Sequence, residues 1–260
     1  MKTLASTRMA GWLAGAAALL AGCTVYAPMQ PTVSSIRQAG QTELSASTQL
    51  NGRIEAAAVY SPLPHVLLAG STTYRPNLGG TTYFATRQWE VGTGTYWPLG
   101  KSWLLTGMGG YGYAATESVQ NELLGNSPLL RARYSKLFGQ VGIDNRFERG
   151  SVGGVYRFTQ LRFDELSFYS PYYQGIVNIA TMGRHEFLLY GRHELPLGKA
   201  HRWQLQFAAG LSVSSQHRVA DTETDAFETN RNLLPVLLAS SGLVFIPTRG
   251  RTARPACDIG

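Results

Sequence analysis

The chain has 260 residues, among them 29 Gly, 13 Tyr, 10 Phe and 5 Trp, and only 15% are charged. This composition favours one β-rich unit. Mean hydropathy is −0.10 and the only long apolar run lies at the start of the chain, which excludes a polytopic helical membrane protein. Two cysteines and five histidines exclude a disulfide-dense scaffold and give little material for a metal centre, so we expect no metal and no cofactor.

The first 22 residues predict a lipoprotein signal peptide. Lys2 and Arg8 are followed by an apolar stretch over residues 9–20 and by Leu20-Ala21-Gly22-Cys23. The last four residues resemble the lipobox of bacterial lipoproteins, which implies that Cys23 is the lipidated residue. Several acyl chains on one residue make a durable anchor, whereas one chain is marginal. A simple secretory signal with an incidental cysteine is the alternative.

Four parts are expected along the chain: a signal peptide over 1–22, an acylated linker over 23–40, a β-barrel over 41–246 and a flexible basic tail over 247–260. By analogy with lipoprotein sorting, Thr24 after the acylated residue permits passage to the outer membrane of a Gram-negative bacterium. The formal charge of +7 falls to +5 when Lys2 and Arg8 are removed with the signal. This mild, dispersed charge gives no reason to expect a nucleic-acid partner.

From Gln41 onward, apolar and polar residues alternate with the period of two that is typical of β-strands. The clearest example is 203–214, where odd positions are apolar or aromatic and even positions are polar or small. It is longer than an ordinary globular strand and satisfies the roughly 9 to 11 residues that a tilted strand needs to cross a bilayer. Ten strands are predicted in all, at 43–50, 54–60, 66–74, 88–97, 103–115, 134–147, 154–163, 185–194, 203–214 and 236–246.

The connections between these strands alternate in length. After a tight hairpin at Asn51-Gly52, the short connections are 61–64, 98–101, 148–150 and 195–201, and the long ones are 75–80, 116–130, 164–182 and 216–234. A barrel with one rim of short turns and one rim of long loops produces this rhythm, as outer-membrane barrels do. We therefore predict an all-β, antiparallel up-and-down barrel of about ten transmembrane strands, with eight strands as the alternative.

Aromatic residues gather at strand ends beside the short turns, namely Tyr60, Trp97, Trp103, Phe147 and Trp203. Amphipathic rings are most stable where hydrocarbon meets water, so this set predicts an aromatic girdle at the periplasmic interface. The alternative is that these rings only staple strand ends, as aromatics do in many β proteins.

If the apolar face of each strand points outward, the inner face is polar and charged. Its candidates are Arg53, Glu55, Glu90, Lys136, Asp144, Arg146, Glu186, Arg192 and Glu194, with Gln140, Gln204 and Gln206. Opposite charges in a narrow lumen must pair, because an unpaired buried charge is costly. Side chains nearly fill a barrel of eight to ten strands, so we expect a plugged barrel rather than an open pore.

Several short motifs resemble a family of uncharacterised lipid-anchored outer-membrane β-barrel proteins of the Bacteroidota. They are Cys23-Thr24-Val25-Tyr26-Ala27-Pro28, the run from Gly52 to Pro62, Gly107 to Tyr113, and Phe138 to Ile143 with Phe147-Glu148. The resemblance runs loosely over the mature chain and implies no activity. One departure is the end of the chain: such barrels often stop at an aromatic residue of the last strand, whereas here a tail follows Phe245-Ile246.

Motifs for catalysis or metal binding are weak. Leu99-Gly100-Lys101-Ser102 leads into a strand instead of a helix, which excludes a phosphate-binding loop. His185, His193 and His201 are eight residues apart, and eight strand residues span about 26 Å, too far for one metal ion.

We therefore predict a non-enzymatic, lipid-anchored outer-membrane barrel with a structural or surface-interaction role in the cell envelope. Its expected partners are outer-membrane lipid and a surface protein or glycan that the long loops would meet. One alternative is a tethered lipocalin-like barrel with reversed faces, in which an apolar small molecule would contact Trp203, Leu205, Phe207 and Leu211. The other is an outer-membrane hydrolase or acyltransferase with His217 and Asp221 at the loop rim.

Overall fold

The computed structural model describes residues 26–77, 83–119, 129–169, 174–176, 179–196, 202–216 and 232–247. Within these ranges no helix is long and apolar enough to cross a membrane. The strands are β1 (Thr42–Gln49), β2 (Ile54–Tyr60), β3 (Leu67–Arg75), β4 (Tyr83–Leu99), β5 (Trp103–Val119), β6 (Leu129–Phe147), β7 (Gly150–Tyr169), β8 (Gln174–Ile176), β9 (Thr181–Glu194), β10 (Trp203–Ser214) and β11 (Val236–Phe245).

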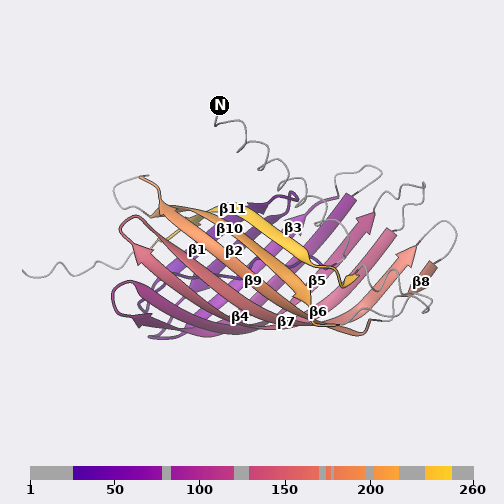
Figure 1. The fold of residues 1–260 in the computed structure, drawn as a ribbon, viewed down its shortest axis with the longest axis horizontal. Coiled ribbons are helices and arrows are strands. Elements are labelled where there is room, and N and C mark those ends of the chain that lie inside the picture. The colour runs from indigo at the N-terminus through magenta and orange to yellow at the C-terminus, as the bar shows by residue number, and fades with distance from the viewer. Residues whose placement is uncertain are drawn as a thin grey trace, which may run out of the picture.

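Ten of these strands form a closed antiparallel ring (Figure 1). Strands β1 to β7 pair in chain order, β7 pairs with β9, β9 with β10 and β10 with β11, and β11 returns to β1. The short β8 pairs only with the end of β7, at Ser167–Tyr169. The predicted ten-strand up-and-down barrel is therefore confirmed, and the eight-stranded alternative is wrong.

Strands β4 to β7 are longer than the sequence predicts, with 17 to 20 residues each. Residues 116–119 and 164–169, expected to lie in loops, extend β5 and β7. Polar residues stand on both faces of the added part of β5, as in Thr116 and Glu117. Because both faces are polar there, hydropathy no longer alternates, and the sequence pattern does not predict this end of the strand.

The connections sort onto the two ends of the barrel as expected. One end, the short-turn rim, carries the connections 61–66, 100–102 and 148–149 and the strand ends at Glu194 and Trp203, and Gly100 in one of these turns has a φ of 66°. At the opposite end, called the long-loop rim, β3, β5, β7 and β10 end and β4, β6, β9 and β11 begin, and the tight turn at 50–53 lies there too. Gly52 in that turn has a φ of 78°, which a side chain would disfavour.

The outer face of the barrel is apolar and the inner face is polar. Phe207 is 56% exposed and Leu189 71% exposed, whereas Gln206 is only 4% exposed. Trp203 and Leu211 also lie on the exterior. The predicted assignment of faces is thus confirmed, and the lipocalin-like alternative, which needs these side chains inside, is ruled out.

The predicted inner face needs two corrections and three additions. Arg146 is exposed near the end of β6, and Glu194 is half-buried at the end of β9, because neither strand end is enclosed by the ring. The buried charges that the sequence analysis missed are Glu43, Arg157 and Arg184.

All five predicted girdle residues are exposed at strand ends on the short-turn rim. Tyr60 ends β2, and Trp103 and Trp203 begin β5 and β10. Trp97 stacks on His65 with 4.2 Å between ring centroids, and Phe147 ends β6. Their shared level suits rings at a membrane interface, and their role as a girdle stays a prediction.

Candidate functional site

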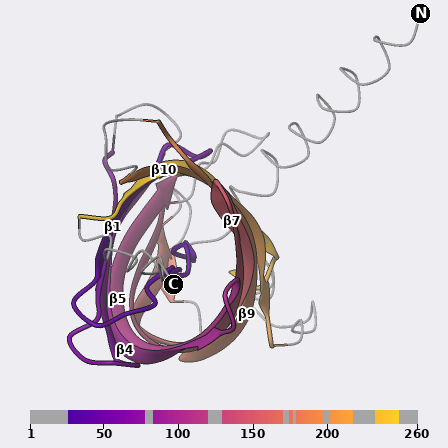
Figure 2. The ribbon, with the colours of Figure 1, turned by 90° about the vertical axis from the view of Figure 1, so that its left-hand side faces the viewer.

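The strongest candidate site is the lumen, because a stretch of the chain's own backbone runs through it. Residues 26–37, called the lumen segment below, precede β1 and lie inside the ring of strands, as the indigo start of the described chain shows in Figure 2. Tyr26, Met29 and Ile36 are each no more than 3% exposed. The sequence predicts an acylated linker over 23–40, and the structure places residues 26–37 of it within the barrel, whereas residues 38–40 are exposed.

The lumen segment runs from one rim to the other. Ile36 packs among residues beside the short turns, including Leu67 and Leu104. Val33 packs at mid-height against Leu188 and Ala208. At the other end Tyr26 belongs to a cluster near the long-loop rim, formed with Ala114, Leu130, Ala132, Tyr134, Leu161, Leu166, Ile179, Met182 and Leu233. The segment has no regular secondary structure, and Pro28 and Pro31 hold no amide hydrogen that would need a partner.

Inward side chains of the barrel bind the backbone of this segment. The carbonyl oxygen of Ala27 accepts a hydrogen bond from Gln88 Nε2 at 2.8 Å, and that of Thr32 accepts one from Gln140 Nε2 at 2.7 Å. The carbonyl oxygen of Val33 accepts one from Arg192 Nη2 at 3.2 Å. Arg53 Nη2 donates to the carbonyl oxygen of Pro28.

Carboxylates and a phenol accept from its amides. The amide of Gln30 donates to Glu55 Oε2 at 3.1 Å, and the amide of Ser35 donates to Glu43 Oε2 at 2.9 Å. A longer bond of 3.5 Å joins the amide of Ala27 to the Tyr134 hydroxyl. Since most of these bonds are to main-chain atoms, the lumen satisfies the polar backbone of an extended peptide that would otherwise be buried unpaired.

Arg37 fastens the segment at the short-turn rim. Its guanidinium donates to the carbonyl oxygens of Lys101 (3.4 Å), Ser102 (2.5 Å) and Trp103 (3.1 Å), all in or beside the β4–β5 turn. Partial burial lowers the pKa of Arg37, but a guanidinium starts so high that it keeps its charge at neutral pH. The β4–β5 turn, which the sequence excludes as a phosphate-binding loop, therefore binds the Arg37 guanidinium through its backbone carbonyl oxygens.

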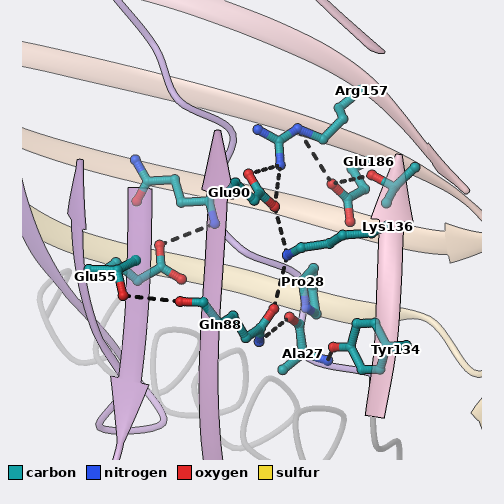
Figure 3. Close-up of polar contacts among 12 residues, drawn as sticks. Ala27, Pro28, Glu55, Gln88, Glu90, Tyr134, Lys136, Arg157 and Glu186 are labelled. Atoms are coloured by element: carbon teal, nitrogen blue, oxygen red, sulfur yellow. Dashed lines mark hydrogen bonds and ion pairs between the residues drawn. The ribbon is translucent and has the colours of Figure 1, made fainter. Parts of the chain in front are cut away.

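A charge network in the lumen wall holds the other end of the segment (Figure 3). Glu90 lies between Lys136 Nζ at 2.7 Å and Arg157 Nη1 at 3.0 Å, and Arg157 lies 4.0 Å from Glu186. Lys136 also donates to Gln88 Oε1 at 3.0 Å, and Gln88 in turn holds the carbonyl of Ala27. The Tyr26 hydroxyl donates to Glu186 Oε1 at 2.5 Å. Wall charges and lumen segment thus form one connected network.

Gly112 makes room for the centre of this network. It lies between Glu90 and Lys136 in the cross-strand register of β4, β5 and β6. A Cβ atom there would lie 2.8 Å from the Glu90 side chain, 2.9 Å from that of Lys136 and 2.5 Å from the carbonyl oxygen of Trp89. The glycine therefore allows the ion pair to form across β5, which explains one of the glycines in the 107–113 run.

The charges in the described part of the lumen balance. The buried acids are Glu43, Glu55, Glu90, Asp144 and Glu186, and the buried bases are Arg53, Lys136, Arg157, Arg184 and Arg192. Two further ion pairs, Arg53–Glu55 at 3.1 Å and Arg192–Glu43 at 2.7 Å, use carboxylates that also hold the lumen segment. Five acids against five bases leave no net charge to select ions of one sign.

Space beside the lumen segment is small. Two hollows next to it, one along Met29–Val33 and one at Ser35 and Ile36, have volumes of about 20 and 50 Å³. One water needs about 10 to 15 Å³ of such volume, so these hollows hold a few waters each and no ligand-sized molecule. The predicted plugged barrel is observed along this path, but a backbone segment fills it together with the side chains.

Removing the segment should turn the barrel into a channel. Deleting residues 26–36 takes away the only backbone described in the lumen, and water and ions can then occupy its path. We expect stepwise ionic conductance in planar bilayers for the deletion variant and a closed baseline for the full mature chain. Gln30→Ala, which removes one side chain and keeps the backbone bonds, should stay closed. Equal conductance of the full chain and the deletion variant would contradict the assignment of the segment as a plug.

Other predicted sites lie outside the described residues or apart from one another. Cys23, His217 and Asp221 are outside the described ranges. His185 lies at 2.8 Å from the Tyr156 hydroxyl, and the described residues hold no group of three or more His, Cys, Asp or Glu side chains that could bind a metal ion. The lumen segment itself was missed, although Tyr26, Met29, Val33 and Ile36 recur in it at an apolar spacing that a solvated linker would not need.

Comparison with known proteins gives structural likeness only. No family model and no curated protein matches the chain. The outer-membrane protease OmpT of Escherichia coli is similar with 8% identity over 79% of this chain and 93% of that one, at a TM-score of 0.46. The translocator domain of the autotransporter NalP from Neisseria meningitidis has 13% identity over 94% and 96%, at 0.42. CarO2 of Acinetobacter baumannii has 10% identity over 80% and 99%, at 0.26. Proteolysis and translocation are not carried over to this chain at such scores.

Proposed function

We propose that this chain is a lipid-anchored outer-membrane barrel without enzymatic activity, which has a structural role or binds a partner at the cell surface. The observation that carries the proposal is the combination of an apolar exterior with a filled, charge-balanced lumen. An apolar exterior on a closed barrel suits lipid, because closure leaves no unpaired strand edge in the hydrocarbon. A filled lumen disfavours transport and leaves the rims as the surfaces available to a partner.

The long-loop rim offers a described surface that supports the binding role. Arg87, Arg131 and Arg133 are exposed on the outer face of β4 and β6 close to this rim. They line a hollow of about 510 Å³ with Tyr74 and Glu117, among other residues. Arg131 and Arg133 pair there with Glu117 at 3.3 Å and Glu165 at 3.5 Å, and the hollow's further arginines, Arg75 and Arg87, leave its lining positively charged. Guanidinium groups recognise phosphate and carboxylate in a planar, bidentate way, so this hollow suits an anionic glycan or headgroup better than an apolar ligand.

The enzyme alternative depends on His217 and Asp221, which the structure does not describe. It predicts that a variant with both residues changed to alanine loses a hydrolase or acyltransferase activity that the parent shows on lipid or peptide substrates. The proposal expects no such activity in either protein.

Cys23→Ala tests the anchor. The variant should take up no labelled fatty acid and stay unprocessed at the Gly22–Cys23 bond, because in lipoprotein maturation the thioether forms before cleavage. Its barrel should still need detergent for extraction, since the apolar exterior does not depend on the anchor. Label on the variant would show that another residue is acylated, and extraction without detergent would remove the membrane-spanning part of the proposal.

A further inference from the structure

The path of the lumen segment has a consequence for the side of the membrane on which the mature chain begins. Strand β1 starts at the short-turn rim, where Gly40 and Ser61 share a backbone hydrogen bond of 2.7 Å. A lipoprotein anchored in the leaflet on that side would need its acylated residue near the same rim. The chain before β1, however, turns back into the barrel at Arg37 and does not leave it again on that side within the described residues.

The length of the segment matches the depth of a membrane. Eleven residue steps separate Tyr26 from Arg37, and an extended chain of that length reaches about 36 Å. The hydrocarbon core of a bilayer is about 30 Å thick. The order of contacts along the segment, from the β4–β5 turn at Arg37 to the cluster of Tyr26 with Leu130 and Leu233, confirms that it crosses the full height of the barrel.

Three peptide units join Cys23 to Tyr26, which allows at most about 11 Å between their Cα atoms. That reach cannot return Cys23 through about 30 Å of barrel to the short-turn rim. We infer that the mature N-terminus, with the acyl chains proposed for Cys23, emerges at the long-loop rim, so that the lipid anchor inserts into the leaflet on the side of the long loops. The inference rests on the proposed lipid anchor and adds the leaflet into which the anchor inserts. When the long loops face the outside of the cell, this is the outer leaflet.

The barrel can assemble around the lumen segment without any covalent bond being broken. The last seam of the ring joins β1 to β11, the first and last strands of the barrel, in the register Leu44 to Phe245. The ring can therefore close around a segment that already carries its acyl group.

Epitope accessibility on intact and permeabilised cells tests the inference. One variant carries an epitope between Val25 and Tyr26, a second carries it after Thr222 in the β10–β11 connection, and a third carries it after Lys101 in the β4–β5 turn. We expect the epitopes at Val25 and Thr222 to give at least ten times the antibody signal of the Lys101 epitope on intact cells, and all three to stain equally after permeabilisation. Heat-modifiable migration in gels shows that each variant has a folded barrel.

A matched deletion provides the control. The Val25 epitope is kept and residues 26–36 are removed, which joins the epitope to Arg37 at the short-turn rim. The signal on intact cells should then fall to the level of the Lys101 epitope. If this deletion does not fold, the three insertion variants still decide the question.

The outcomes separate the inference from the proposed function. A Val25 epitope that follows the Lys101 epitope, with Thr222 exposed, overturns the inference and leaves the surface role intact. A Thr222 epitope hidden on intact cells, with Lys101 exposed, removes the surface role. In that case a Val25 epitope that is hidden along with Thr222 still supports the threading, and one that is exposed overturns it.

Discussion

Phe207→Arg should prevent stable insertion of the barrel. Phe207 lies in the middle part of β10, is 56% exposed on the outer face, and pairs with Gly191 and Ser241 in the neighbouring strands. A cation at the bilayer midplane on the lipid face costs about 2 to 4 kcal/mol. Folding into lipid vesicles, followed by heat-modifiable migration in gels and tryptophan fluorescence, should give a folded fraction far below that of the parent.

Two variants control for size and for charge. Phe207→Leu keeps the side chain apolar and should insert like the parent. Gln206→Glu places a charge one residue away on the lumen side, where Gln206 Oε1 already accepts a bond of 2.8 Å from Arg192 Nε, so this charge meets a cation and should be tolerated. Normal insertion of Phe207→Arg would mean that this face of β10 does not contact lipid.

Glu90→Gln should be the most destabilising change in the lumen. Glu90 is 3% exposed and sits at 2.7 Å from Lys136 and 3.0 Å from Arg157. Its neutralisation leaves two buried cations facing each other without an anion between them. Removing one partner of a buried ion pair costs about 3 to 5 kcal/mol, which we expect as a loss in free energy of unfolding in detergent micelles.

A surface pair and a double variant show whether burial causes the effect. Glu165→Gln breaks the Arg133–Glu165 pair, whose side chains are 65% and 38% exposed, and should cost less than about 1 kcal/mol. Arg157 keeps Glu186 at 4.0 Å when Glu90 is neutralised, so adding Lys136→Gln to Glu90→Gln removes the cation that has lost its paired carboxylate and should recover part of the loss. Similar losses for Glu90→Gln and Glu165→Gln would indicate that water screens the lumen network as it does a surface pair.

The strand pattern was predictable because it depends on local alternation. In 203–214 the side chains that face outward and those that face the lumen alternate with period two, and the structure places Phe207 outside and Gln206 inside as the alternation requires. The ten barrel strands follow from the same alternation. It fails at 116–119, because there both faces are polar.

The candidate site could be predicted only in part. Glu90, Lys136 and Glu186 were expected on the inner face, since their positions alternate with apolar ones. Arg157 was missed in a strand that was itself predicted, and Arg184 lies just before the predicted start of its strand at 185. No spacing rule connects these residues, because the 4.0 Å contact between Arg157 and Glu186 joins strands through the pairing of β7 with β9.

By itself the sequence determined the all-β class of fold, the alternation along each strand and the distribution of short and long connections, since each of these depends on residues close together in the chain. The choice of ten strands over eight and of an apolar exterior over an apolar interior needed the closed ring. Only the tertiary structure decided what fills the lumen. The lumen segment does not alternate as a strand does, and its bonds reach Glu55, Gln140 and Arg192, which lie between 25 and 159 residues away. Such contacts exist only once the ring has closed, because the closed ring brings inward side chains from distant strands around one extended backbone.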